Sequence, residues 1–379
     1  MKTIKRRWLL SLLIFILAIS SLSVGVGVGV TPTPTTTSVS ATRDKWLQPF
    51  ASNSIWNMPI GSNAAYVSAG LQAAGSTGVD VNLLYKVPAA SPERPIYDPY
   101  SWAHRAQGTN VADPNRRKTM PIPDNLIVPD ATPTDTPNNA STFLLTDGLT
   151  LVQIAPLARV SIGGPVYGWV WQDQNILGDG RMGSHGGSGL SSIGGTIRLG
   201  ELTDPDPIRH ALQLEVWAQK YLSYNSDETP GYRWPAYVAD SYAKGNYRGK
   251  NSALEMGALL ALPPFVTVES LGLQTDIGRK LFHALQDYGG YIVDDTAWDA
   301  YTIGVENGVE AEVQATYGYA LEQSSGALHN DLNKLFSALA VVNNNSPTSI
   351  GGGGTPRRPL APPLIQRRLP QRHKGRHRP

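Results

Sequence analysis

The sequence contains no cysteine, which excludes disulfide bonds and thiolate metal sites. It shows no repeat at a fixed period, so repeat architectures are excluded as well. The glycine-rich stretch 178–202 has neither the G-x-x-x-x-G-K-[ST] pattern of a phosphate-binding loop nor the G-x-S-x-G pattern of a nucleophile elbow. The fold must therefore be stabilised by its own buried apolar surface, which a domain of roughly 300 residues can supply.

Acidic residues are absent from both ends of the chain. At the N-terminus, four bases in residues 1–7 precede an apolar run, the pattern of an export signal. Extended to residue 30, the run is also long enough to span a bilayer. We therefore expect residues 1–30 to be a signal peptide or an N-terminal membrane anchor. The Thr/Pro-rich residues 31–45 predict an extended linker, so the protein is expected to be secreted or extracellular, either free or tethered to membrane or wall.

The C-terminal residues 346–379 are rich in glycine, proline and bases, and we expect them to be a disordered tail. The tail either contacts an anionic wall polymer or membrane surface, or is solvated without a specific role. Without the four bases of residues 1–7 and the eight of residues 356–379, 20 bases face 30 acids. This acidic core argues against nucleic acid as its ligand.

Residues 46–345 are expected to form a single mainly-β domain, because short apolar runs alternate with Gly and Pro turns. We predict a β-sandwich of jelly-roll or concanavalin-like type with a few peripheral helices. The clearest signal is a hairpin over 141–157 around Asp147-Gly148. Further strands are predicted within 166–174, 194–202, 208–219, 254–263 and 289–295, and helices over 63–75, 275–290 and 327–342.

A resemblance to a known family rests on several short motifs. Residues 50–67, "FASNSIWNMPIGSNAAYV", resemble the "F…N-x-W-N" opening of a family of secreted bacterial proteins. The motifs "IRHALQLEV", "RWPAYVA", "MGALLAL" and "ALQDYGGYIVDD" follow in that family's order. The chain departs from the pattern at "GSGLSSIGGTIRLGEL", where relatives have a less glycine-rich loop with a "GLP-x-LPGL"-like stretch. The resemblance implies secretion and a concanavalin-like or jelly-roll sandwich, and it leaves the chemistry open.

Two histidines are candidate catalytic residues. His185 lies among the glycines of 178–202, which let a ligand approach the backbone closely, and we expect this loop to form the edge of a cleft. His210 lies on the apolar face of a predicted strand, where an imidazole is costly unless it is hydrogen-bonded or lines a cleft. A solvated loop histidine and a satisfied core histidine are the respective alternatives.

Carboxylates supply a second set of candidates. Asp173 follows an alternating segment, and Asp294 and Asp295 lie close to Tyr291 in "YIVDDTAWDAY". Glycoside hydrolysis requires two carboxyl groups, one acting as acid and the other as base or nucleophile. Such acids can also bind calcium, although the EF-hand spacing is absent, so no cofactor is expected and calcium is left open. Solvated surface acids are the alternative.

Aromatic and arginine side chains suggest substrate contacts. Trp102, His104 and Arg105 share one predicted loop, and Arg233 and Trp234 share another. Tryptophan offers a stacking surface for sugars, and arginine forms paired hydrogen bonds with carboxylates. Aromatic residues that simply pack on the end of a sandwich would look the same.

These observations predict a secreted carbohydrate-active protein that cleaves a polysaccharide. In a lyase, His210 or His185 would abstract a proton, Tyr291 would protonate the leaving oxygen and Arg233 would neutralise a uronate.

In a glycoside hydrolase, Asp173 and either Asp294 or Asp295 would share the acid and base roles. A non-catalytic carbohydrate-binding module and a structural cell-envelope protein are the alternatives. A polysaccharide is the expected partner, and the protein is expected to be a monomer.

Overall fold

The computed structural model describes residues 43–108 and 118–364, which belong to one compact unit. The expected signal or anchor and most of the expected linker lie outside the described residues. Within the described ranges, no helix is long and apolar enough to cross a membrane.

Strands dominate the described residues. The strands are β1 (Tyr66–Ser68), β2 (Ser76–Lys86), β3 (Glu93–Tyr97), β4 (Thr119–Pro121), β5 (Ser141–Leu144), β6 (Thr150–Ala158), β7 (Val166–Val170), β8 (Gln174–Asn175), β9 (Leu212–Trp217), β10 (Leu259–Ala261), β11 (Gly290–Thr296), β12 (Ala300–Glu306) and β13 (Ala340–Val342). The α-helices are α1 (Ala218–Tyr221), α2 (Ala243–Asn246), α3 (Val268–Leu271), α4 (Asp276–Asp287), α5 (Val309–Tyr317) and α6 (Ala327–Ala338), with 3₁₀ turns η1 (Trp102–His104) and η2 (Ile350–Gly352). The predicted mainly-β class with few helices is confirmed, and the sandwich type stays a prediction.

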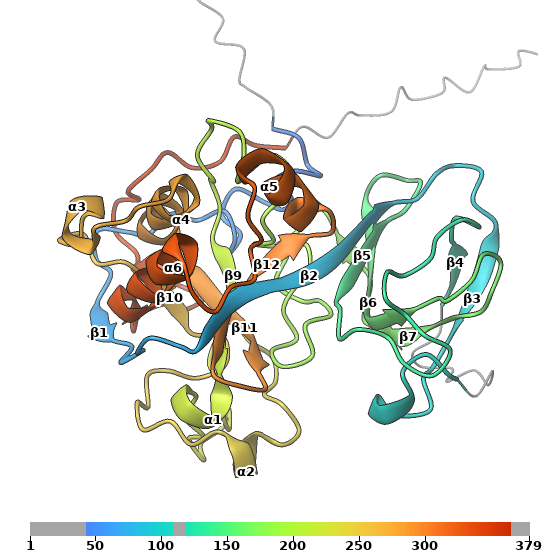
Figure 1. The fold of residues 1–379 in the computed structure, drawn as a ribbon, viewed down its shortest axis with the longest axis horizontal. Helices are drawn as coiled ribbons and strands as arrows, with labels where there is room; N and C mark the ends of the chain where they lie inside the picture. Colours follow the sequence, from blue (N-terminus) through green and yellow to red (C-terminus); the bar gives the residue numbers. More distant parts are fainter. Residues whose placement is uncertain (1–42, 109–117, 365–379) are drawn as a thin grey trace, which may run out of the picture. The chain divides into compact units, whose positions relative to one another are not determined.

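The strands form one mixed sheet in the order β1-β13-β10-β11-β9-β12-β2-β5-β6-β7-β3-β4, with β8 beside β6. The long strand β2 joins its two parts. Residues 76–82 pair in parallel with β12, and residues 83–86 pair in parallel with β5 (Figure 1). The predicted hairpin is confirmed as the antiparallel pair of β5 and β6.

One face of the central strands is apolar. Leu212, Leu214 and Val216 of β9 are buried in the main core with alternate residues of β12. Helices α4, α5 and α6 contribute apolar side chains to the same core. Because successive side chains of a strand point to opposite faces, the intervening residues of β9 and β12 face away from this core.

The glycine-rich stretch 178–202 packs on the opposite, polar face. It was expected to contain a strand over 194–202, but no regular strand forms there, so this prediction is wrong. Gly195 has a positive φ of 76°, and a β-carbon there would lie 2.5 Å from the Trp56 ring. The stretch therefore lies close against its neighbours as buried irregular backbone.

Two other expectations are wrong. The helix predicted over 63–75 is absent, because Tyr66–Ser68 pairs with β13 as strand β1. The tail was expected to be disordered from residue 346, but residues 346–364 pack against the domain. The Arg357 backbone N–H donates to the Ile60 carbonyl, and the Arg358 side chain donates to Asp287 at 2.6 Å.

Candidate functional site

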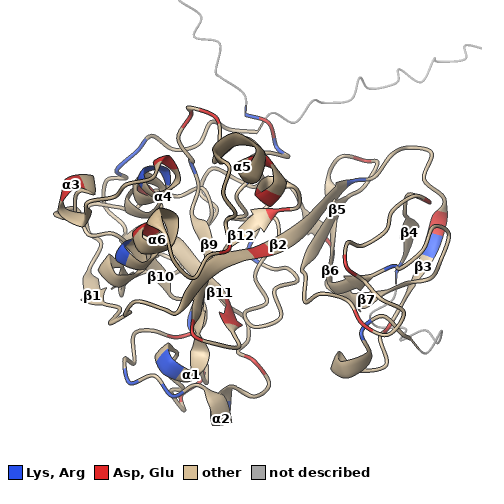
Figure 2. Cartoon of the chain, viewed as in Figure 1, with Lys and Arg blue, Asp and Glu red and all other residues tan. Residues whose placement is uncertain are grey.

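Six titratable side chains gather on the polar side of the central strands. Strand pairing explains part of the gathering, because Glu215 of β9 lies beside Asp294 of β11. Asp80 of β2 lies beside Gly304 of β12. Figure 2 shows acidic segments on both β2 and β11. The set, called the carboxyl cluster below, is Asp80, His185, Glu215, Asp240, Asp294 and Asp295.

Gln213 fixes the orientation and tautomer of His185. The Gln213 amide nitrogen donates to the carbonyls of Ser191 at 3.0 Å and Gly194 at 2.6 Å, so its oxygen must be the acceptor toward His185. His185 Nε2, 3.2 Å from that oxygen, therefore carries the proton. Nδ1 is left with its lone pair, 4.0 Å from an oxygen of Asp294. Burial lowers the pKa of His185 to about 4, so the ring is neutral at ordinary pH.

Asp80 and Glu215 form a carboxyl pair. Their side chains are hydrogen-bonded to each other, and the Thr302 hydroxyl donates to Glu215. Burial raises the pKa of Asp80 to about 6 and raises that of Glu215 well above its ordinary value. Because Glu215 is buried and also faces Asp294, Glu215 holds the proton of the pair and Asp80 is the group that ionises.

Asp294 and Asp295 lie at the more open side of the cluster. The Asp294 side chain is 19% exposed, and it accepts from the Asp295 backbone N–H at 2.9 Å. The Tyr242 hydroxyl donates to Asp295 at 2.8 Å. Burial and the neighbouring acid Asp240 raise the pKa of Asp295 to about 7 and that of Asp294 well above its ordinary value. Both carboxyl groups therefore keep their protons to a higher pH than an exposed aspartate does.

No lysine or arginine takes part in the interactions described for these six side chains. The charge of the cluster must therefore be balanced by protons or by a bound cation. Two triads have ligand atoms within 4.8 Å of one another: Asp80, His185 and Glu215, and Asp240, Asp294 and Asp295. The second triad offers only carboxylate oxygens, the ligands that suit calcium, so calcium stays open as predicted.

The structure brings three predicted catalytic residues together, namely His185, Asp294 and Asp295. The other predicted histidine, His210, precedes β9, and its Nε2 lies 3.0 Å from a Glu201 oxygen. Its Nδ1 lies 2.9 Å from the Ala211 carbonyl. Glu201 raises the pKa of His210, although burial opposes this. Its described contacts are thus those of a buried ion pair, with no member of the carboxyl cluster among them.

Asp173 and Tyr291 also have partners outside the cluster. The Asp173 carboxylate pairs with Lys118, and its side chain is 40% exposed. Tyr291 is buried, with its ring edge-to-face with Trp56 at 5.5 Å between centroids. Burial raises the pKa of Tyr291 above its ordinary range, which makes proton donation harder.

Trp234 is joined to Pro235 by a cis peptide bond, and Arg233 comes immediately before it. The Arg233 guanidinium donates to the Ala253 carbonyl at 2.9 Å and to the Asn343 carbonyl at 2.8 Å. Trp234 is half-buried and packs against apolar side chains. These contacts hold the domain together and already occupy the arginine.

The predicted loop with Trp102, His104 and Arg105 forms the 3₁₀ turn η1 and its C-terminal cap. Trp102 is 55% exposed, and the Arg105 guanidinium lies 4.9 Å from its ring centroid. His104 is exposed. Of the predicted substrate-binding residues, this group is the one that offers an exposed aromatic surface.

Sequence reasoning missed Asp80, Glu215, Asp240 and Gln213. A signal for three of them exists in the alternation of β2 and β9, "GVDVN" and "LQLEV", in which every second residue is polar. That pattern usually marks a solvent-facing side, so it does not by itself predict a buried cluster. Asp240 lies in a loop, and no local pattern distinguishes it.

Fold and site together define a mainly-β protein with a half-buried carboxyl cluster on one face of its sheet. No family model, curated protein or solved structure matches the chain.

Proposed function

We propose that the protein is a secreted glycoside hydrolase that cleaves a neutral polysaccharide at the carboxyl cluster. The observation that carries the proposal is the pairing of Asp294 with Asp295 beside a neutral histidine, on a face that is partly open. Glycoside hydrolysis needs one carboxyl group that holds its proton and one that is ionised. The expected export and the resemblance to secreted proteins agree with a substrate outside the cell.

Asp294 is the proposed general acid and Asp295 the proposed ionised partner. Burial, together with the acidic neighbours Asp240 and Asp295, raises the pKa of Asp294 well above its ordinary value, whereas the Tyr242 hydroxyl stabilises the ionised form of Asp295. Their ligand atoms lie within 4.8 Å. This separation is shorter than the roughly 6.5–9.5 Å that inverting enzymes leave for a water molecule, so retention of configuration is the expected outcome.

His185 positions the acid. Its unprotonated Nδ1 faces Asp294 at 4.0 Å, and the Gln213 contact prevents the ring from turning. The Gly187 backbone N–H lies 3.5 Å from the same Asp294 oxygen. The loop that bears both groups thus holds the carboxyl from one side.

Charge favours a hydrolase over a lyase. A lyase acting on uronates needs a cation to neutralise the substrate carboxylate, and Arg233, predicted for this role, is bound to Asn343 and the Ala253 carbonyl. The acids of the cluster would also repel an anionic polymer. A neutral glycan avoids both difficulties.

The test uses the purified protein on neutral and uronate polysaccharides, following reducing ends and the ultraviolet absorbance of unsaturated products. We expect reducing ends without absorbance, and at least a hundredfold loss of kcat in Asp294→Asn with little change in polysaccharide affinity. Asp299→Asn, an acid five positions away outside the cluster, is the matched control and should stay within twofold. Rising absorbance would identify a lyase, and binding without turnover would identify a carbohydrate-binding module.

The basic tail contributes less to attachment than its sequence suggests. Arg357 and Arg358 both lie within ion-pair distance of Asp287, at 3.6 and 2.6 Å. These two bases therefore serve the fold, and any contact of the tail with an anionic wall polymer or membrane would use the bases beyond residue 364.

A further inference from the structure

Aromatic side chains line one side of β7 and its extension. Tyr167, Trp169 and Trp171 alternate along this segment, so their side chains share a face. Trp169 lies beside Trp102 of η1, with ring centroids 6.1 Å apart and planes within 6° of parallel. The two rings thus stack on each other, which fixes the orientation of both. Trp102 is 55% exposed, and Tyr167, Trp169 and Trp171 are half-buried.

A charged pair also contacts the Trp102 ring. The Arg105 guanidinium lies 4.9 Å from the Trp102 ring centroid, and Asp135 accepts two hydrogen bonds from it, at 2.8 and 3.1 Å. The cation–π contact and the bidentate ion pair fix the ring and neutralise the arginine. A preorganised ring loses less conformational entropy when a ligand binds.

The aromatic row approaches the carboxyl cluster through the glycine-rich loop. A β-carbon at Gly189 would lie 3.6 Å from the Trp171 ring and 3.2 Å from Tyr237 Cβ. A β-carbon at Gly187, two residues earlier, would lie 2.5 Å from Asp294. The loop that contains both glycines therefore lies between the aromatic residues and the proposed acid and packs closely against each.

The loop also secures Tyr237. Its backbone N–H donates to the Ser188 carbonyl at 2.8 Å, and the Arg181 guanidinium lies 3.9 Å from its ring centroid. Arg181 in turn donates to the Pro235 carbonyl at 2.6 Å. We call Trp102, Trp169, Trp171 and Tyr237 the aromatic path.

We propose that a neutral glycan chain binds along the aromatic path, with the bond to be cleaved at Asp294. The inference rests on the proposed hydrolase function and adds that the substrate is a polymer held by several successive sugar units. Sugar rings present flat C–H faces that pack on aromatic rings, while their hydroxyl groups remain hydrated. Nucleic acid also stacks on aromatic rings, but its phosphates would be repelled by the acidic core.

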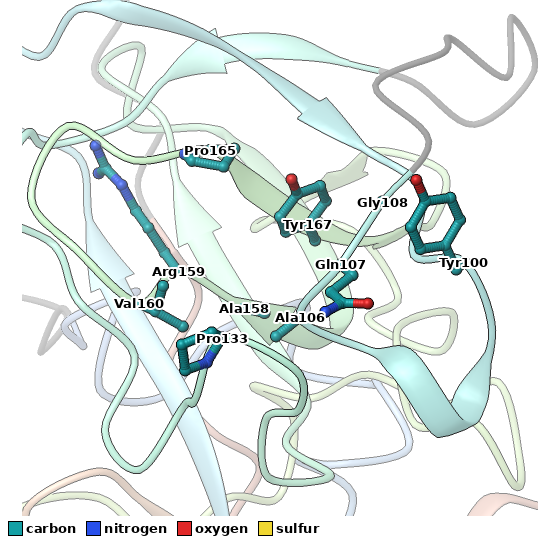
Figure 3. A pocket seen from close by; sticks show the side chains of 10 residues that line it. All are labelled: Tyr100, Ala106, Gln107, Gly108, Pro133, Ala158, Arg159, Val160, Pro165 and Tyr167. Atoms are coloured by element: carbon teal, nitrogen blue, oxygen red, sulfur yellow. The ribbon is translucent and has the colours of Figure 1, made fainter.

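A cavity lies beside β7 at Tyr167. It has a volume of about 330 Å³, and its lining includes Tyr100, Gln107 and Tyr167 (Figure 3). Tyr167 precedes Trp169 by two residues on the same face of β7. Figure 3 shows the Arg159 guanidinium at the opposite side of the lining from Tyr100. The volume lies at the low end of the range of ligand pockets and suits one terminal sugar unit.

The experiment measures polymer binding and turnover separately. Full-length wild type, Trp102→Ala and Trp169→Ala are run in native gels containing soluble xylan, mannan or mixed-linkage glucan. KM is measured on the polymer that retards the wild type and on short oligosaccharides from it. We expect each variant to bind the polymer about tenfold more weakly, with kcat on the shortest cleaved oligosaccharide within twofold of the wild type.

Trp298→Ala is the matched control, because Trp298 is 60% exposed but lies in the turn between β11 and β12, off the path. Equal loss in Trp298→Ala, unchanged binding in both path variants, or no retardation of the wild type by any of the polymers would overturn the aromatic path. Weaker gel binding of the path variants, without turnover of any glycan, would keep the path and refute the hydrolase. Turnover with unchanged polymer KM in the variants would keep the hydrolase and refute the aromatic path.

Discussion

Replacing Gly304 by alanine should destabilise the protein through Gln213. A β-carbon at Gly304 would lie 2.0 Å from Gln213 Oε1 and 2.8 Å from its Cβ, so the glutamine side chain must move. Gly304 does not have a positive φ, and the backbone itself therefore accepts alanine. The cost thus comes from the contacts that the displaced glutamine loses.

Those contacts set the magnitude. The Gln213 side chain makes four hydrogen bonds of 2.6–3.2 Å, and Gln213 is fully buried. A buried hydrogen bond contributes about 1 kcal/mol, and an orphaned buried partner costs about 1–3 kcal/mol. We expect Gly304→Ala to lower the free energy of unfolding by about 4 kcal/mol, a large part of the roughly 5–15 kcal/mol of a typical protein.

Equilibrium urea unfolding measures this change, and Gly245→Ala is the control. A β-carbon at Gly245 would meet no atom within 4 Å, so its effect should stay within about 0.5 kcal/mol. Freed from Gln213, His185 should also lose its fixed tautomer, which nitrogen chemical shifts report. A loss below about 1 kcal/mol in Gly304→Ala would refute the role given to Gln213.

Three further outcomes are expected. First, the melting temperature should fall as pH rises from 4 to 7, because Asp80 and Asp295 ionise later in the folded than in the unfolded chain, and folding then opposes their ionisation. His185, with its lowered pKa, acts in the opposite direction. Because Asp295→Asn removes one of the two carboxyl groups, it should flatten the fall of melting temperature with pH. An unchanged slope of melting temperature against pH in this variant would contradict the assignment. Second, activity after EDTA treatment should stay within twofold of the untreated protein, since the hydroxyl groups of Tyr242, Tyr247 and Thr302 already donate to carboxyl groups of the cluster. Dependence of the activity on added calcium would instead show a metal centre. Third, truncation after residue 345 should lower the melting temperature, because it removes both ion pairs to Asp287; an unchanged value would mean that residues 346–364 add nothing.

Local chemistry explains which elements could be predicted from the sequence. The β5–β6 hairpin follows from Asp147-Gly148, because the Asp147 carboxylate accepts from the Leu149 and Thr150 backbone N–H groups within the turn. Helix α4 follows from its apolar spacing and from Thr275, whose hydroxyl accepts from the Gly278 N–H. Each signal lies within a few residues and depends little on the rest of the chain.

Long-range pairing explains the errors. Residues 63–75 have the alanine content of a helix, but Tyr66–Ser68 pairs with a strand more than 270 positions away.

The site residues differ in the same way, according to whether their signal is local or depends on strand pairing. Asp294, Asp295 and His185 are recognisable because each occurs in a distinctive local segment. Asp80 and Glu215 become site residues only when β2 and β9 are placed on either side of β12.

The desolvated carboxyl groups on the polar face of the sheet lower the stability of this fold. A conventional half-buried sheet would carry apolar or amide side chains where the carboxyl cluster lies, and each such replacement would remove a desolvated acid. Random mutagenesis screened only for heat resistance should therefore collect substitutions at Asp80, Glu215 and Asp294. Thermostable descendants chosen in that way would keep the architecture and lose the chemistry, so directed evolution of this protein needs a selection for turnover from the first round.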